Sequence, residues 1–497
     1  MEDSTNSKEY KGIFKSTFLF GFVQVFNISV KVITNKIVAV LLGAEGIGLI
    51  GIYHSTISLL KTGAGLGISQ SAVRDISEAN AAKGKERFSL IISVTKKVIL
   101  LTALLGCVVT IGLSPWLSEW TLGNRSYVLA FACLSVVVGI NILTEGQLAI
   151  LKGMRQLQAL AKASMIGAVA GLISAIPMYF FFGKQGIIPS LFLTALSALC
   201  FSNYFVKKIK YNKQNFSFRV ACYEAKPMVQ MGIALMFTSF IMSLSDLIVA
   251  SYITKNGGLD ILGHYNAGNT IISGYFGLIV TAMTTDYYPR ISAVHYDNKK
   301  LEEEVNRQSK VGLILVFPLG ILFLFLSPVF INALYSNEFE ASIVFTDFAF
   351  LGVIIAICSN CMGMILLAKQ KSSIFIWTTL LHRILLTCIY IYLYKLYGLF
   401  GLGIGYIITV IINFALMSFI MRRFYKISFS ANLIKHLLIV LFFALLVLGV
   451  KHIDHLWLKY FIGSSLFVIS CAYSILIMKL EMNINIFNIM KNRINKK

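Results

Sequence analysis

Apolar positions along the chain gather in long stretches instead of alternating with polar positions. A bilayer-spanning helix needs about 20 mostly apolar residues, and fourteen stretches approach or exceed that length. They cover 16–40, 48–70, 91–113, 126–148, 160–182, 186–206, 228–253, 265–287, 311–332, 343–366, 373–394, 399–421, 434–450 and 460–479. The pattern predicts an all-α polytopic membrane protein with about fourteen transmembrane helices.

The composition excludes several classes of protein. Apolar residues make up 57% of the 497 residues and charged residues only 13%, which is about half the charged share of an ordinary globular domain. This balance excludes an ordinary soluble enzyme, a disordered chain and a secreted disulfide scaffold.

The net charge of +22 is unevenly distributed among the connections. Of the 44 Lys and Arg residues, 35 lie in the alternate set of connections that includes both ends of the chain. Cytoplasmic loops carry an excess of Lys and Arg, so both termini are predicted to be cytoplasmic. The charge then reflects topology, and no nucleic-acid partner is expected. The first apolar run is longer than the apolar part of a signal peptide, so no cleavable signal is expected.

Residues recur at an offset of about 215 positions. At this offset the sequence matches Glu45 with Asp260, Gly48 with Gly263, Ser58 with Ser273, and Gly183 with Gly398. Six spans separate the copies, so the two halves have the same orientation, as in a parallel repeat. We expect a first six-helix lobe over 1–212, a second over 213–427, and two added helices with a cytoplasmic tail over 428–497.

The short connections leave little room for catalysis. The longest is about 25 residues, and the sequence contains neither a phosphate-binding G-x-x-x-x-G-K-[ST] motif nor H-E-x-x-H. Cys358 and Cys361 lie in an apolar helix, where thiols act as small hydrophobic groups. We therefore predict that the chain is not an enzyme, with no catalytic residue, metal or cofactor.

Polar residues inside the spans indicate a functional cavity, because an ionisable group at mid-membrane costs about 2.5–3.5 kcal/mol. They form stripes on the first two helices of each predicted lobe, which suggests a water-filled cleft between two lobes. The candidate substrate-binding residues are Asn27, Lys31, His54, Lys61, Asn266 and Ser273.

Two carboxylates inside the spans have more than one interpretation. Asp246 is the candidate ion-coupling residue for H⁺ or Na⁺, and it could equally pair with Lys31, Lys36 or Lys61. Glu145 lies near the cytoplasmic end of its span and could instead neutralise a loop lysine.

Short motifs resemble a known family. The segment from Leu42 to Leu49, followed by Gly63 to Ile68, resembles Wzx-type O-antigen translocases. These are lipid-linked oligosaccharide flippases of the multidrug/oligosaccharidyl-lipid/polysaccharide exporter superfamily. Ala44 replaces the family's usual proline, and Asp246 resembles an aspartate often found in helix seven.

The resemblance implies a V-shaped pair of lobes with alternating access in a bacterial inner (plasma) membrane. The implied substrate is an undecaprenyl-diphosphate-linked oligosaccharide, moved from the cytoplasmic to the periplasmic leaflet. Cationic residues in the cavity are typical of the family, and Lys31 and Lys61 occupy similar places. The position equivalent to Lys61 in the second repeat is Phe276, so the second lobe lacks a matching cation. Membrane lipids and a polysaccharide polymerase machinery are expected partners. The alternatives are a multidrug or cation antiporter, a lipid II-type flippase, and a membrane polymerase or ligase.

Overall fold

The computed structural model describes residues 2–81, 85–209 and 218–482, and the regular elements within these ranges are all helical. The α-helices are α1 (Glu2–Ala64), α2 (Ile68–Ala81), α3 (Lys85–Leu122), α4 (Val128–Gly153), α5 (Leu157–Phe182), α6 (Ile187–Lys207), α7 (Phe218–Asn269), α8 (Gly277–Ala293), α9 (Asn298–Phe325), α10 (Ser327–Leu334), α11 (Ala341–Ala368), α12 (Ser372–Ile420), α13 (Ala431–Val450) and α14 (Leu456–Leu480). Short 3-10 turns, η1 (Gly183–Gly186) and η3 (Asn337–Glu340), and π-helical turns, η2 (Thr270–Phe276) and η4 (Met421–Tyr425), join some of them.

Ten helical stretches in the described part of the chain are long and apolar enough to cross a bilayer. Four of them are about twice the length of one crossing: Gly21–Ala64, Leu157–Lys207, Leu235–Thr281 and Ser372–Tyr425. Each of these four covers two of the predicted spans. The prediction of an all-α polytopic membrane protein is therefore confirmed.

Glycines divide these double-length stretches at repeat-equivalent positions. Gly43 (φ 66°) interrupts α1 and Gly258 (φ 84°) interrupts α7, 215 positions later. Gly183 (φ 53°) ends α5 and Gly398 (φ 57°) interrupts α12 at the same offset. A positive φ is strained for residues with a Cβ atom. The sequence repeat is therefore also a repeat of backbone conformation.

The end of the second predicted span differs from the expectation. The sequence pattern continues it to residue 70, whereas α1 ends at Ala64 and the separate helix α2 begins at Ile68. Leu66 (φ 48°) and Gly67 (φ 62°) both leave the right-handed helical region, so the helix cannot continue through them. Most of the amphipathic helix α2 lies between the second and third predicted spans, where the sequence pattern predicts a connection.

The described residues group into two compact units. The first comprises Met1–Asn266 with Leu334–Ser336, and the second comprises Ala267–Ala333 with Asn337–Lys497. In the second unit, buried residues of α8, α9, α11 and α12 form one apolar core, which includes Ile291, Val305, Ile365 and Met417. The lobe boundaries expected from the sequence remain a prediction.

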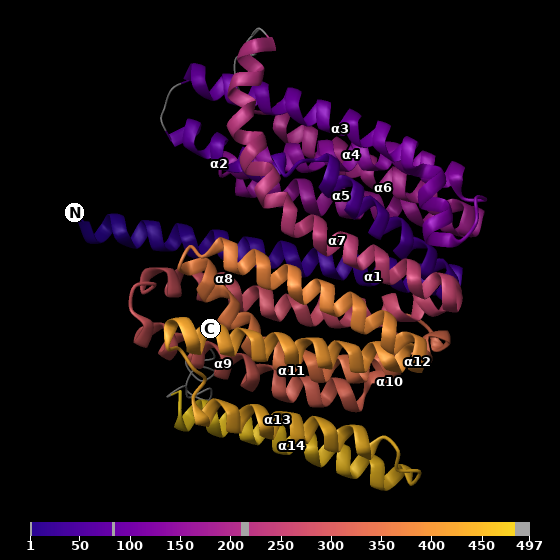
Figure 1. Ribbon diagram of the computed structural model, residues 1–497, viewed down its shortest axis with the longest axis vertical. Helices are drawn as coiled ribbons and strands as arrows, with labels where there is room; N and C mark the ends of the chain where they lie inside the picture. The colour runs from indigo at the N-terminus through magenta and orange to yellow at the C-terminus, as the bar shows by residue number, and fades with distance from the viewer. Residues whose placement is uncertain (1, 82–84, 210–217, 483–497) are drawn as a thin grey trace, which may run out of the picture. The chain divides into compact units, whose positions relative to one another are not determined.

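Helices α13 and α14 lie side by side in the second unit (Figure 1). Ion pairs at both ends join them to the other helices of that unit. At one end Lys451 pairs with Asp347 of α11 and donates a hydrogen bond to Ser327. Burial lowers the pKa of Lys451, and the carboxylate of Asp347 opposes that shift. At the other end Lys310 of α9 pairs with Glu481, just after α14.

Candidate functional site

Three of the predicted site residues come together on α1 in the first unit. Lys31 and Lys61 both lie within electrostatic range of the His54 imidazole. Lys31 and His54 lie about equally far on the two sides of Gly43, so their proximity requires the two halves of α1 to lie alongside each other. We call Lys31, His54 and Lys61 the lysine cluster. The side chains of Lys31 and His54 are exposed, and that of Lys61 is partly exposed.

Lys61 is paired with a carboxylate on another helix of the same unit. Its Nζ atom lies 2.6 Å from Oε1 of Glu145 on α4. The side chains are 27% and 45% exposed respectively, so the pair can be reached from outside the packed core. The sequence alone indicates Asp246 as one candidate partner of Lys61, and a loop lysine as the alternative partner of Glu145. Glu145 could be recognised in the sequence as the single carboxylate inside the fourth predicted span. Its distance from Lys61, however, depends on how α4 packs against α1.

Asn27 lies one helical turn before Lys31 and contacts α5. Its Nδ2 atom donates a hydrogen bond to Oγ of Ser164, at 3.0 Å. Its Oδ1 atom is buried, and none of the described residues supplies a hydrogen-bond donor to it. A buried unpaired acceptor is costly, so this amide has a vacant acceptor position beside the lysine cluster.

Helix α7 packs antiparallel to the second half of α1. The hydroxyl groups of Ser58 and Ser243 are 3.1 Å apart, and the ring of Phe240 lies against Gly63. Asp246 follows Ser243 by one turn, so this register places it near the level of His54. The side chain of Asp246 is exposed, and it is not without an interaction partner.

The remaining two predicted residues lie in α7 and in the π-helical turn η2. Asn266 packs its side-chain amide against Gly51, and its buried Nδ2 atom has no acceptor among the described residues. Ser273 belongs to the second unit, where its hydroxyl donates to Oδ1 of Asn269 at 2.9 Å. It is exposed and lies in the π-helical turn η2.

A second feature of the first unit is a cavity of about 680 Å³. Glu45 and Tyr53 of α1, Tyr127 before α4, and Lys184 and Gln185 of η1 line it together with apolar side chains. Glu45 and Lys184 form an ion pair there. The volume lies within the range of small-molecule sites. The sequence marks Glu45 only as a repeat position, and its proximity to Tyr127 and Lys184 depends on how separate elements pack.

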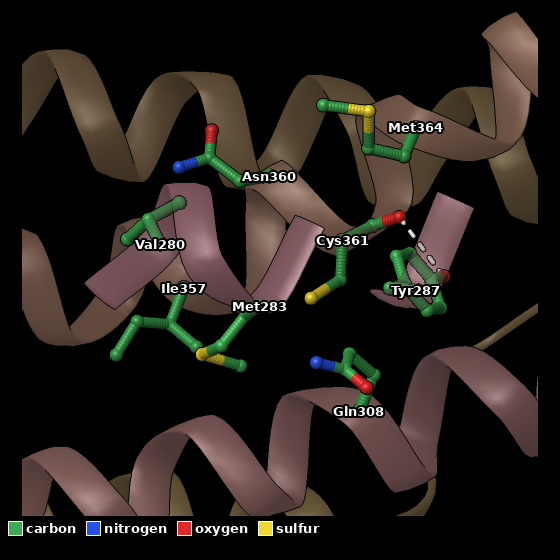
Figure 2. A pocket seen from close by; sticks show the side chains of 8 residues that line it. All are labelled: Val280, Met283, Tyr287, Gln308, Ile357, Asn360, Cys361 and Met364. Atoms are coloured by element: carbon green, nitrogen blue, oxygen red, sulfur yellow. Dashed lines mark hydrogen bonds between the residues drawn. The ribbon is translucent and has the colours of Figure 1, made fainter. Parts of the chain in front are cut away.

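The second unit contains a small pocket between α8, α9 and α11 (Figure 2). Tyr287 donates a hydrogen bond to the carbonyl oxygen of Cys361 at 3.1 Å, and Met283 and Ile357 close the apolar side. Its volume of about 10 Å³ holds at most one water molecule. Cys361 lines this pocket, and Cys358 is also buried. Within the described ranges no three His, Cys, Asp or Glu side chains form a metal-binding group.

Comparison with known proteins places the sequence in a family. A family model described as "Polysaccharide biosynthesis protein" matches residues 37–344. The lipid III flippases of Escherichia coli (strain K12) and Shigella flexneri are each 20% identical over 393 residues. Each alignment covers 77% of this chain and 92% of the relative.

Solved structures share the fold. The lipid II flippase MurJ in an inward closed conformation superposes with a TM-score of 0.71 at 16% identity, covering 94% of this chain and 99% of that chain. An inward-facing multidrug resistance MATE family transporter of the MOP superfamily gives 0.64 at 16% identity, covering 82% and 96% respectively. Because the family match spans more than half of the sequence, the chain belongs to the polysaccharide biosynthesis protein family, and it shares its fold with the solved MurJ and MATE structures.

Proposed function

We propose that the chain is a flippase that moves an undecaprenyl-diphosphate-linked oligosaccharide, such as an O-antigen repeat unit, from the cytoplasmic to the periplasmic leaflet. The lysine cluster carries this proposal, because Lys31 and Lys61 bring two positive charges near His54, and Lys61 already binds a carboxylate there at 2.6 Å. A diphosphate carries two negative charges and needs compensating cations inside the membrane. Lysine side chains can supply them as point charges. The similarity to lipid III and lipid II flippases supports the same class of substrate.

The polar residues near the lysines suit the oligosaccharide. Asn27 offers a vacant acceptor, and Ser58 and Ser243 offer hydroxyl groups where α1 meets α7. In our proposal the sugars bind such groups in a cleft between two lobes, while the lipid tail stays in the bilayer. Asn266 and Ser273 are proposed to line the side of the cleft formed by the second lobe.

The membrane potential can assist this transport. An inside-negative potential favours outward movement of an anion by about 2.3 kcal/mol per charge per 100 mV. The proposed cycle of alternating access therefore requires no nucleotide. We propose that Asp246 couples the cycle to H⁺ or Na⁺, and that polysaccharide polymerase machinery accepts the product.

Complementation of a flippase-null bacterial strain tests this function. The chain should restore surface polysaccharide and remove the accumulated lipid-linked intermediates, which are measured in membrane extracts. Persistent accumulation despite normal expression in the membrane would contradict the proposal. Export of cationic dyes, with no effect on the intermediates, would instead favour a multidrug antiporter.

A further inference from the structure

Glu145 occupies the place where an anionic ligand of Lys61 would bind. Its Oε1 atom lies 2.6 Å from Nζ of Lys61, which is the distance of a charge-assisted hydrogen bond. Both side chains keep substantial exposure, 27% for Lys61 and 45% for Glu145. A partly exposed ion pair contributes little net stability and can be replaced, so this contact can exchange with another anion.

The described residues that line the small cavity at Glu145 offer it no second counter-charge. Beside Lys61, a small cavity at Glu145 is lined from α2 and α3 by Ile68, Ser69, Ile99 and Thr102, and none of these is ionisable. Within the described ranges, Lys61 is the ion-pair partner of this carboxylate. If another anion took Lys61, Glu145 would have to turn toward solvent.

Charge balance indicates which anion would do this. Lys31 and Lys61 together match the two negative charges of a diphosphate, and no ion pair to Lys31 forms within the described ranges. While Glu145 holds Lys61, only one of these positive charges is uncompensated. A carboxylate that stayed beside a bound diphosphate would repel it.

We propose that Glu145 is an exchangeable counterion that holds Lys61 in the empty transporter and is displaced by the substrate diphosphate. This inference rests on the proposed function, because it takes the diphosphate as the ligand of Lys61. The displaced carboxylate remains tethered on α4 and competes for Lys61 at a high effective concentration. It therefore weakens binding and speeds release of the flipped lipid.

Binding of farnesyl diphosphate to the purified full chain in lipid nanodiscs, followed by calorimetry, tests the exchange. Glu145→Gln should bind the probe on the order of tenfold more tightly, because the competing charge is absent. Glu145→Asp, whose shorter side chain pairs less well, should be intermediate. The matched control is Glu119→Gln, which removes the carboxylate of the exposed Glu119–Arg125 pair and should leave affinity unchanged.

The outcomes separate the exchange from the function on which it rests. If wild-type protein binds the probe, and both Glu145→Gln and Glu145→Asp bind it equally or more weakly, the exchange is wrong and diphosphate recognition stands. A lower melting temperature without tighter binding would likewise mean that the pair only joins α1 to α4. Absence of probe binding by the folded wild-type protein would overturn the exchange together with the proposed substrate.

Discussion

The backbone of Gly51 lies against the side-chain amide of Asn266, and the two residues occupy the same position in the two repeats. A contact between equivalent residues is what a two-fold axis produces. The second half of α1 and the end of α7 therefore meet symmetrically within the first unit.

Neighbouring glycines repeat this symmetry. Gly48 faces the backbone carbonyl of Leu259, and Gly263 faces that of Ala44. Gly263 is the repeat equivalent of Gly48 and Leu259 that of Ala44, so the same contact forms twice with the two repeats interchanged. A Cβ atom at either glycine would overlap a carbonyl group. We expect Gly48→Val and Gly263→Val each to destabilise the protein by about 1–3 kcal/mol, the usual cost of overpacking.

Thermal unfolding of the purified variants in detergent measures this effect. Gly112→Val in α3 is the control, because a Cβ atom at Gly112 meets no atom within 4 Å. Similar melting temperatures for the Gly48, Gly263 and Gly112 variants would show that the helices move apart without cost.

Part of this architecture could be predicted from the sequence. The spans and the repeat follow from hydropathy and from matches such as Gly183 with Gly398. The positive φ at Gly43 and Gly258 could not be read from the sequence, because glycine also occurs inside helices. The stripes placed Lys31 and Lys61 on one face of each helix, but the pairing of Lys61 with Glu145 depends on how α1 packs against α4.

Asp246→Asn tests the proposed ion coupling. The change removes a charge near the level of His54 and keeps the side-chain shape. Flipping in proteoliposomes should then lose its dependence on an imposed H⁺ or Na⁺ gradient, while flipping without a gradient persists. A well-folded variant with the gradient dependence of the wild type would mean that Asp246 serves another role, such as pairing with a lysine.

Glu481 should make the attachment of α14 sensitive to acid. The Lys310 ammonium, which donates a hydrogen bond to this carboxyl, lowers the pKa of Glu481 below its ordinary value. A lowered pKa in the folded state gives stability that is present above the ordinary pKa and is lost as the pH falls through the folded pKa. Because the Glu481 side chain is 27% exposed, its contribution should be about 0.5–1 kcal/mol.

Melting temperatures of wild type and Glu481→Gln across this acidic range measure the effect. The gap between them should be widest at neutral pH and should close as Glu481 becomes protonated. Glu338→Gln, at an exposed position in η3, is the control and should match the wild type throughout. A constant gap at all pH values would exclude titration of Glu481 as the cause.

The charge distribution predicts membrane orientation. Reporter fusions at Lys184 and Lys395 should indicate the periplasm, and a fusion at Lys426 should indicate the cytoplasm. Lys184 and Lys395 lie at repeat-equivalent connections, next to Gly183 and before Gly398. A cytoplasmic signal at Lys395 would contradict the parallel arrangement of the repeats in the membrane.

The most direct test of the account is flipping of a diphosphate-linked oligosaccharide in proteoliposomes containing the Lys31→Ala/Lys61→Ala double variant. Removing lysines from a span lowers its insertion cost, so the variant should reach the membrane at wild-type levels. We predict that its flipping is abolished or strongly reduced, whereas the Lys31→Arg/Lys61→Arg variant keeps part of the activity because the charges persist. Wild-type flipping by the double alanine variant would contradict the account, since the diphosphate would then be bound without the lysine cluster.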